Sequence, residues 1–447
     1  MAKLNETTAD GSKRFKTDFP KYNDDNKSED KYQGVQLPME ILLKIFSYLN
    51  KVELLRMGTM CRSWRDLIHN TPSLWRNIHL DLSCNRKSAH NRRTFWYAQQ
   101  FGMNFWNLSV SCSHEHESDV CKFMGVDFRK LLLTMQPPSL RSIKITDLEL
   151  RGALLNTVKV IREMLIQTLN RTDGLHSFKM SALFSVEEGS KVLDAVFSVS
   201  RGTLETLYID RFFRKSLLYY HRNEHDKLTN GILSLTRLTK LGIDYLQLTD
   251  GFLTALSRSH AGQLKRLKVV ARDLKEDVPR FNYYNHSNTL ATDSWLPLTK
   301  SCPDLRVVFV TDDLTLADFE SIMEILNPVM PIYKIKILSV FEYLDDLGFE
   351  NVLNEITANF KNTLVKFEME RSNTATHIDA AFLDLVRNCQ RLTYIKVSVN
   401  FSDPETERMA QELVQARRRQ LETSKSQEMP NKRAKLTPAD GPGSSPA

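Results

Sequence analysis

Residues 37–75 read LPMEILLKIFSYLNKVELLRMGTMCRSWRDLIHNTPSLW, and this stretch decides how the first folded part of the chain is built. Pro38 suits the first turn of a helix, where no amide hydrogen is needed, and Glu40 complements the positive end of the helix dipole. Apolar residues then recur at three- and four-residue spacing, with an interruption at Asn50 and Lys51, so the pattern predicts several short helices. A segment of about 40 residues is at the lower limit for burying its own core, and part of its apolar surface is therefore expected to meet a partner.

The order of apolar, turn and cationic residues in this stretch resembles an F-box. The matching residues are Leu37, Pro38, Glu40, Ile41, Leu42, Ile45, Phe46, Leu49, Leu54, Cys61, Arg62, Trp64, Arg65, Leu74 and Trp75. The resemblance implies a helical module that docks on the Skp-family adaptor of a cullin-RING ubiquitin ligase. It implies adaptor contacts from Leu37, Pro38, Ile41, Leu42 and Ile45, and an internal core of Phe46, Leu49 and Trp64. Met60 stands where such boxes usually carry valine, and the alternative interpretation is a generic amphipathic helical cap.

Beyond this segment the chain repeats a short strand pattern, written apolar-x-x-apolar-x-apolar. Eleven copies begin at Trp75, Phe105, Leu140, Leu175, Leu204, Leu238, Leu264, Leu305, Ile332, Leu364 and Leu392, with an average spacing of about 32 residues. Helix-patterned segments lie between the strands, among them residues 154–169, 186–200, 248–259 and 378–389. Neither element buries its apolar face alone, so the repeats are expected to stack into a curved α/β horseshoe with strands on its concave side.

Two cysteines connect this pattern to a known class of repeat. Cys302 and Cys389 each lie three residues before the first leucine of a strand and resemble the cysteine position of the cysteine-containing leucine-rich repeat. The asparagine usual after the strand is mostly absent, so the repeats are irregular. Together with TFWYAQQFG at residues 94–102, the arrangement resembles the F-box only protein 39 group. The predicted fold is a helical F-box at 35–76 followed by an irregular leucine-rich-repeat-like α/β horseshoe solenoid at 77–401.

The strand pattern also predicts a basic surface. Side chains alternate across a strand, so the third and fifth residues of each pattern are expected to face away from the core. Nine of these 22 positions are basic and one, Glu368, is acidic, whereas 61 Lys and Arg among 447 residues would place about three there. We predict that this concave face binds an acidic or phosphorylated protein substrate through Lys144, Lys179, Lys268, Lys334, Lys336, Lys396, Tyr208 and Phe309. The alternative is that exposed strands carry lysine for solubility.

Enzymatic, metal and membrane functions receive no support from the sequence. The chain has no phosphate-binding glycine loop and no GxSxG, HExxH or CxxC motif, so we expect a non-catalytic protein without a cofactor. Cys112, His114, His116 and Cys121 cluster without a standard zinc spacing, and no metal is predicted. No apolar stretch reaches the roughly 18 residues that span a bilayer, and no signal peptide is apparent. The six scattered cysteines favour a reducing, intracellular compartment.

The remaining segments are polar or helical. Residues 1–34 and 423–447 are predicted to be disordered arms, and residues 402–422 to form a capping helix. The long spacing at residues 272–295 is either a binding insertion or a spacer. A resemblance to a bipartite nuclear localisation signal is carried by Arg417, Arg418, Arg419, Lys432, Arg433 and Lys435, and it predicts a location in the nucleus, the cytoplasm or both.

These observations predict a substrate-recognition subunit of a ubiquitin ligase of the Skp adaptor, cullin and F-box type. The F-box would hold the Skp-family adaptor and through it a cullin-RING scaffold, while the repeat face presents a protein substrate. One alternative is a ligase-independent nuclear scaffold, which would bind no adaptor. A second is a nucleic-acid-binding solenoid, whose affinity would fall steeply with salt. Few aromatic residues lie among the basic ones, and the sequence has no recognised nucleic-acid-binding motif. Both observations count against the second alternative.

Overall fold

The structure is a computed structural model, and it describes residues 37–83, 89–113, 121–135, 140–148, 150, 155–214, 217, 221–272, 290–312, 325–339, 346–376 and 378–434. The chain divides into two compact units between Asn70 and Thr71. We call residues 37–70 the helical unit and the described residues from Thr71 onward the strand–helix unit. Among the described residues, no helix is both long enough and apolar enough to cross a membrane.

The helical unit contains α1 (Met39–Tyr48), α2 (Lys51–Met57) and α3 (Arg62–Asn70). The predicted interruption at Asn50 is a capping box, in which the Asn50 Oδ1 accepts hydrogen bonds from the amides of Val52 and Glu53, both at 3.0 Å. In return, the Glu53 carboxylate accepts the Asn50 amide at 2.8 Å. Since the side chains satisfy amides that a helix start leaves open, the chain stops α1 and begins α2 at this point.

The core of the helical unit is small and aromatic at its centre. Phe46, Leu54 and Ile68, one from each helix, are at most 1% exposed. The Phe46 ring meets the Trp64 ring edge to face, with 5.5 Å between the ring centres, and Leu49 is half-buried. The three predicted core residues therefore lie toward the inside of the helical unit, with Phe46 the most completely buried.

All eleven predicted strands are present in the strand–helix unit. They are β1 (Asn77–Ser83), β2 (Asn107–Ser113), β3 (Ser142–Thr146), β4 (Ser177–Met180), β5 (Thr206–Tyr208), β6 (Lys240–Asp244), β7 (Arg266–Arg272), β8 (Arg306–Asp312), β9 (Ile332–Ser339), β10 (Lys366–Thr376) and β11 (Tyr394–Phe401). They form one sheet in sequence order, and every neighbouring pair is parallel. This order is that of a solenoid, in which each repeat pairs only with its neighbours.

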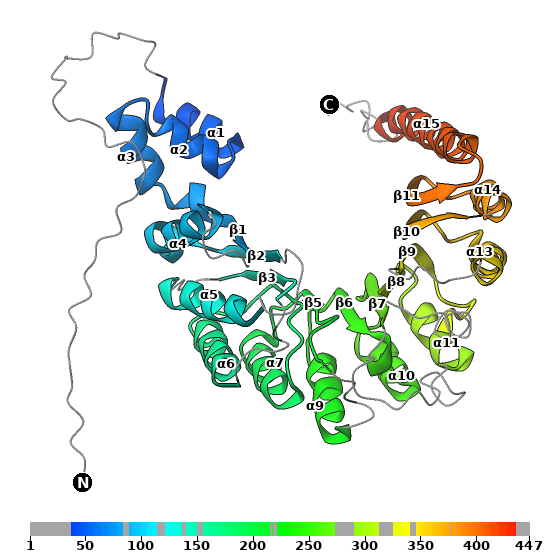
Figure 1. Ribbon diagram of the computed structural model, residues 1–447, viewed down its shortest axis with the longest axis horizontal. Helices are drawn as coiled ribbons and strands as arrows, with labels where there is room; N and C mark the ends of the chain where they lie inside the picture. Colours follow the sequence, from blue (N-terminus) through cyan, green and yellow to red (C-terminus); the bar gives the residue numbers. More distant parts are fainter. Residues whose placement is uncertain are drawn as a thin grey trace, which may run out of the picture. The chain divides into compact units, whose positions relative to one another are not determined.

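Helices connect the strands and cover one face of the sheet (Figure 1). They are α4 (Ala89–Phe101), α5 (Cys121–Thr134), α6 (Leu155–Asn170), α7 (Val186–Ser200), α9 (Arg222–Leu233), α10 (Asp250–Ser259), α11 (Thr292–Ser301), α13 (Asp346–Phe360), α14 (Asp379–Asn388) and α15 (Glu405–Ala434). Short 3-10 turns are η1 (Pro72–Trp75), η2 (Gly102–Asn104) and η3 (Tyr245–Gln247). The predicted α/β solenoid of alternating strands and helices is confirmed. We call the face of the sheet turned away from the helices the open face.

Alternating burial follows the strand pattern. In β3, Ile143 and Ile145 are buried toward the helices while Lys144 is exposed on the open face. The first apolar residue of the pattern, such as Leu140 or Leu175, is buried just before its strand. The pattern therefore marks the residues that hold each strand against the helix layer.

Strand β8 departs from the predicted alternation, and the prediction for Phe309 is wrong. Phe309 is 1% exposed and Val307 is fully buried, so both face the helices, while Val308 lies on the open face. In the sheet register Val307 pairs with Leu267. The pattern beginning at Leu305 would pair Val307 with Arg266, so the observed register differs from the predicted one by one residue. Residues 307–310 read VVFV, and four apolar residues in a row do not specify which of them point inward.

The two repeat cysteines lie between neighbouring repeats. Cys302 is 2% exposed, and its thiol donates to the carbonyl of His260 at 3.2 Å. Cys389 is fully buried, and burial raises the pKa of its thiol to about 11. Both are free cysteines without a disulfide. A thiol with so high a pKa is not a nucleophile near neutral pH, so Cys389 has a structural role.

Helix α15 is longer than the predicted capping helix. It continues to Ala434, whereas the sequence predicted an end at residue 422 and a disordered tail beyond it. Residues 423–429 read TSKSQEM and contain Lys, Gln, Glu and Met, which favour helix, while the glycines of the tail come only after residue 440. Ala410 and Val414 on this helix are buried, so its first part packs on the last repeat.

Candidate functional site

The first candidate site is an apolar surface on α1. Leu37, Ile41 and Ile45 are 41%, 48% and 42% exposed. Pro38 is also exposed, and Leu42 is half-buried. These are the five residues predicted to contact the adaptor. Leu37 and Pro38 directly precede α1, and Ile41, Leu42 and Ile45 lie in its first two turns at three- and four-residue spacing. We call the five residues the α1 patch.

The α1 patch exists because the helical unit is too small to cover its own first helix. Of the ten residues of α1 only Phe46 is buried, while Met39 and Tyr48 are 60% and 76% exposed. An exposed group of large apolar side chains in so short a segment is typical of a surface that binds another protein. The patch has the composition of a docking surface and carries no group suited to chemistry.

The second candidate site is the open face of the sheet, where most of the predicted basic residues lie. Lys144 of β3 is the register partner of Lys179 of β4, and Lys240 of β6 is the partner of Arg266 of β7. Neighbouring strands are about 4.8 Å apart, so each pair holds two like charges side by side. We call Lys144, Lys179, Lys240 and Arg266 the cation cluster.

Two other predicted lysines on the open face, Lys268 and Lys334, form ion pairs with acids. Lys268 forms an ion pair with Asp210, and the Lys334 ammonium lies 2.6 Å from the Glu368 carboxylate. Lys336 and Lys396 are the register partners of Glu368 on its two sides. One glutamate cannot neutralise three lysines, so the open face stays positive at β9 to β11 as well as at the cation cluster.

Tyr208 is half-buried at the centre of the cation cluster. The Lys179 ammonium lies 5.1 Å from the centre of the Tyr208 ring, a cation–π contact that positions the charge. Gly242 makes room for the ring, because a Cβ atom there would stand 2.8 Å from the Cδ1 of Tyr208. Gly242 also pairs with Tyr208 in the sheet register. The sequence predicted Tyr208 on this face but gave no signal for the glycine beneath its ring.

The pKa of Lys179 reflects its burial and the positive charge of the cation cluster. Its pKa is lowered, first because burial desolvates the ammonium and then because Lys144, Lys240, Arg266 and Lys268 add positive charge around it. An anion that entered the cluster would offset this repulsion by its opposite charge. The arrangement thus favours a bound negative group.

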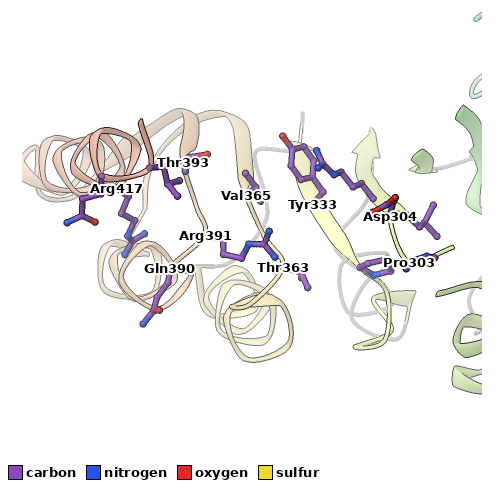
Figure 2. A pocket seen from close by; sticks show the side chains of 14 residues that line it. Pro303, Asp304, Tyr333, Thr363, Val365, Gln390, Arg391, Thr393 and Arg417 are labelled. Carbon is purple, nitrogen blue, oxygen red and sulfur yellow. The ribbon is translucent and has the colours of Figure 1, made fainter. Parts of the chain in front are cut away.

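A pocket of about 880 Å³ lies at the amino-terminal edge of β8 to β11 (Figure 2). Arg306, Tyr333, Arg391 and Arg417 help to line it, and the Arg306 guanidinium lies 5.1 Å from the centre of the Tyr333 ring. Arg391 donates to the carbonyl of Asn362 at 3.4 Å. Because Arg391 and Arg417 already bind backbone carbonyls, the pocket offers a ligand fewer donors than the cation cluster does.

Arg417, one of the six residues of the predicted nuclear localisation signal, has a structural role. Its guanidinium donates to the carbonyls of Val386, Cys389 and Arg387 at 2.7, 3.0 and 3.0 Å. These carbonyls belong to the end of α14, where a cation also complements the helix dipole. Arg417 is therefore held on the last repeat, while Lys435 lies outside the described residues.

A buried ion pair at the carboxyl ends of β6 and β7 was not predicted. The Arg272 guanidinium lies 3.0 Å from the Asp244 carboxylate, and both side chains are at most 7% exposed. The same arginine donates to the carbonyl of Phe213 at 2.5 Å. Asp244 and Arg272 are 28 residues apart in the sequence, so no local sequence pattern predicts their ion pair. Buried and fully engaged, it holds two neighbouring repeats together and is not available to a ligand.

Two further predictions concern residues that the structure does not describe. His114 and His116 of the cysteine and histidine cluster lie in the range 114–120, and the insertion aromatics Phe281, Tyr283 and Tyr284 lie in the range 273–289. Within the described parts of the chain, no group of three or more histidine, cysteine or acidic residues is placed to hold a metal ion. For residues 272–295, a binding insertion and a spacer both remain predictions.

Comparison with known proteins defines the class of the helical segment. Residues 35–81 match the F-box-like family. Over 40 residues the chain is 52% identical to F-box only protein 48 of Homo sapiens, a match that covers 9% of this chain and 26% of that protein. The chain therefore carries an F-box-like domain, as the sequence predicted from Leu37 to Trp75.

A second match is much longer than the F-box-like segment. The chain is 23% identical over 288 residues to F-box/LRR-repeat protein 21 of Bos taurus, a match that covers 61% of this chain and 58% of that protein. Among solved structures, the complex of Rad7 and Elc1 in yeast is similar at 16% identity and a TM-score of 0.37, over 84% of each chain. The chain thus spans less than two thirds of the length of the two curated relatives. It is homologous to F-box/LRR-repeat protein 21, whereas the resemblance to the F-box only protein 39 group stays a prediction.

Proposed function

We propose that this protein is the non-catalytic substrate-recognition subunit of a ubiquitin ligase of the Skp adaptor, cullin and F-box type. The observation that carries the proposal is the α1 patch, because Leu37, Ile41 and Ile45 remain exposed inside the segment that matches the F-box-like family. The patch holds the Skp-family adaptor, and the adaptor connects the chain to a cullin-RING scaffold. The open face of the strand–helix unit holds the protein substrate.

The test is co-expression of the chain with a Skp-family adaptor, followed by gel filtration. We expect the wild-type chain to elute with the adaptor, and the double variant Ile41→Asp/Ile45→Asp to elute without it, because two charges in the patch would have to be desolvated. Both positions are exposed, so the variant is expected to stay folded. Far-ultraviolet circular dichroism verifies this point.

Leu133→Asp is the matched control. Leu133 lies on α5 and is 48% exposed, as Ile41 is, so the control adds a charge to an equally exposed apolar position outside the helical unit. It should elute with the adaptor. A folded wild-type chain that never elutes with the adaptor would refute the ligase role and favour a scaffold that uses only the open face.

A further inference from the structure

The amino-terminal edge of strands β1 to β4 carries a row of cationic and aromatic side chains. Arg76, Trp106, Arg141 and His176 each directly precede the first residue of a strand, and these first residues are register partners. The amide of Trp106 donates to the carbonyl of Arg76 at 2.9 Å, and the amide of Arg141 donates to the carbonyl of Trp106 at 2.7 Å. The sheet ladder therefore fixes the backbone from which these side chains extend.

The indole of Trp106 positions two guanidinium groups. The Cζ of Arg76 lies 3.7 Å from the ring centre, and the Cζ of Arg141 lies 4.2 Å from it. Because β2 lies between β1 and β3 in the sheet, the two arginines approach the ring from opposite sides. Guanidinium groups stacked in this way keep their N–H edges free and lose little conformational freedom when they bind a ligand. We call Arg76, Trp106 and Arg141 the rim stack.

The fold offers the rim stack no acceptor of its own. Among the described residues, neither guanidinium takes part in a hydrogen bond or an ion pair, and the buried Nε of Arg76 has no hydrogen-bond partner. Glu205, the next residue of the row after His176, lies 3.5 Å from Arg237 and is engaged there. Each arginine has five N–H donors, so the rim stack is suited to a ligand that carries acceptors and negative charge.

The geometry of the rim stack fits carboxylates on alternate residues of an extended chain. With one guanidinium on each side of the indole, the two Cζ atoms are about 8 Å apart. Alternate side chains of an extended peptide lie on one side of the chain and about 7 Å apart. Met103, three residues before Trp106, is 61% exposed in η2 and adds an apolar side chain at this edge. Arginine, tryptophan and methionine are the residue types that protein interfaces favour.

We propose that the rim stack binds an extended acidic segment of a partner protein, with carboxylates on alternate residues. Each arginine binds one carboxylate through two parallel N–H groups, and Met103 packs against an apolar side chain of the same segment. The rim stack lies outside the α1 patch and the open face. This partner is therefore additional to the adaptor and the substrate of the proposed function.

A nucleic acid fits the rim stack less well. Both faces of the Trp106 indole carry a guanidinium, so no base can stack on it. The row from Arg76 to His176 crosses four strands, or about 14 Å at the usual strand spacing, before Glu205 interrupts it. Single-stranded nucleic acids need a longer basic groove and open aromatic faces.

Fluorescence polarisation with the purified full chain tests the proposal. The probe is a fluorescein-labelled peptide in which glutamate and threonine alternate. One reference peptide carries glutamine in place of every glutamate, and a second has the same composition with its glutamates in adjacent pairs, so that no two lie two residues apart. We expect the alternating peptide to bind at least about tenfold more tightly than the first reference and about threefold more tightly than the second.

Variants of the rim stack separate charge from geometry. Arg141 is exposed, so Arg141→Gln is expected to stay folded, and it should lose about tenfold in affinity for the alternating peptide. Arg141→Lys keeps the charge but not the two parallel donors, so it should lose about threefold or more. Far-ultraviolet circular dichroism verifies that both variants are folded.

Arg306→Gln is the matched control, because Arg306 is an exposed arginine at the same edge of the sheet that also lies over an aromatic ring, that of Tyr333. The double variant Lys144→Ala/Lys179→Ala is the control for the cation cluster on the open face. Both controls should keep the affinity within about twofold of wild type.

Three outcomes would overturn the proposal. The alternating peptide could bind no more tightly than either reference peptide, or a control could lose as much affinity as Arg141→Gln does. A labelled single-stranded RNA could also bind more tightly than the alternating peptide and lose that affinity in Arg141→Gln, which would assign the rim stack to a nucleic acid. None of these measurements involves the adaptor, so their result is independent of the gel-filtration test of the ligase role.

Discussion

His260 stabilises the boundary between two repeats through its ring and its backbone. The ring Nε2 lies 2.9 Å from the carbonyl of Leu235, and the carbonyl of His260 accepts the thiol of Cys302. The side chain belongs to a residue that is 1% exposed. Because a carbonyl only accepts, Nε2 carries the hydrogen, and the neutral ring satisfies the carbonyl without placing a charge in the core.

This burial makes the stability of the strand–helix unit depend on pH. The pKa of His260 is lowered by burial, with the bond to Leu235 opposing the shift. Above the unfolded pKa of about 6.5 the ring is neutral in both states, and below it the unfolded chain takes up the proton first. We therefore expect the free energy of unfolding to fall as the pH drops below about 6.5, by at most about 1.4 kcal/mol per pH unit.

Urea unfolding at about pH 7.5 and about pH 5.5 measures this effect. His260→Gln keeps a donor for the Leu235 carbonyl but does not titrate, so the variant should lose part of the difference between the two pH values. An identical pH dependence in the variant and the wild type would show that His260 stays neutral in both states or charges freely in both.

The sequence predicts the orientation of single side chains better than it predicts their ion pairs. The sequence predicted that Lys268 and Lys334 face away from the core, and both lie on the open face. It did not predict their ion pairs, because Asp210 lies 58 residues before Lys268 in the chain and the pairing depends on how repeats stack. The charge available to a ligand is therefore a property of the folded sheet.

At the scale of the element, α2 depends on its first residue. Asn50 accepts the amides of Val52 and Glu53, and the Glu53 carboxylate returns a hydrogen bond to the Asn50 amide. Asn50→Ala removes this side-chain acceptor, and we expect it to cost about 1 kcal/mol in the free energy of unfolding of the helical unit. Since α2 holds Leu54 in the small core, the melting temperature of that unit should fall.

Thermal unfolding followed by circular dichroism on the chain bound to its adaptor measures the change. Asn50→Asp is the control, because aspartate caps a helix as well as asparagine does and its charge suits the helix start. A melting temperature that falls equally in both variants would show that the amide group of Asn50, and not its capping oxygen, is what α2 requires.

Elements were predictable where their apolar residues were separated by polar ones. In β3, Ile143 and Ile145 flank Lys144, and the alternation determines which side faces the helices. In β8, the run from Val307 to Val310 offers no polar marker, so the assignment of Phe309 failed. The eleven strands and their order followed from the repeat period, whereas the inward side of an all-apolar strand is decided by pairing with its neighbours.

At the scale of the whole molecule, the strand–helix unit needs a cap at the end of its sheet. Strand β11 is the last in the order, and α15 packs beside it and α14 through the buried residues Ala410 and Val414. Arg417 fixes this helix by donating to three carbonyls at the end of α14. Solenoids require such terminal elements because the last repeat has no neighbour to cover its apolar side.

Truncation after residue 404 should therefore destabilise the last repeats first. The shortened chain loses the buried residues Ala410 and Val414 and the three hydrogen bonds from Arg417 to the end of α14. An uncovered last repeat with an open strand edge promotes self-association. We expect amide hydrogen exchange to accelerate in β10, β11 and α14 while β3 to β6 stay protected, because each repeat of a solenoid is stabilised only by its neighbours.

Truncation after residue 434 is the matched control, since it keeps all of α15, and the exchange of this variant should equal that of the full chain. Uniform acceleration from β1 to β11 would show instead that the sheet unfolds as one cooperative body and that α15 stabilises all of it.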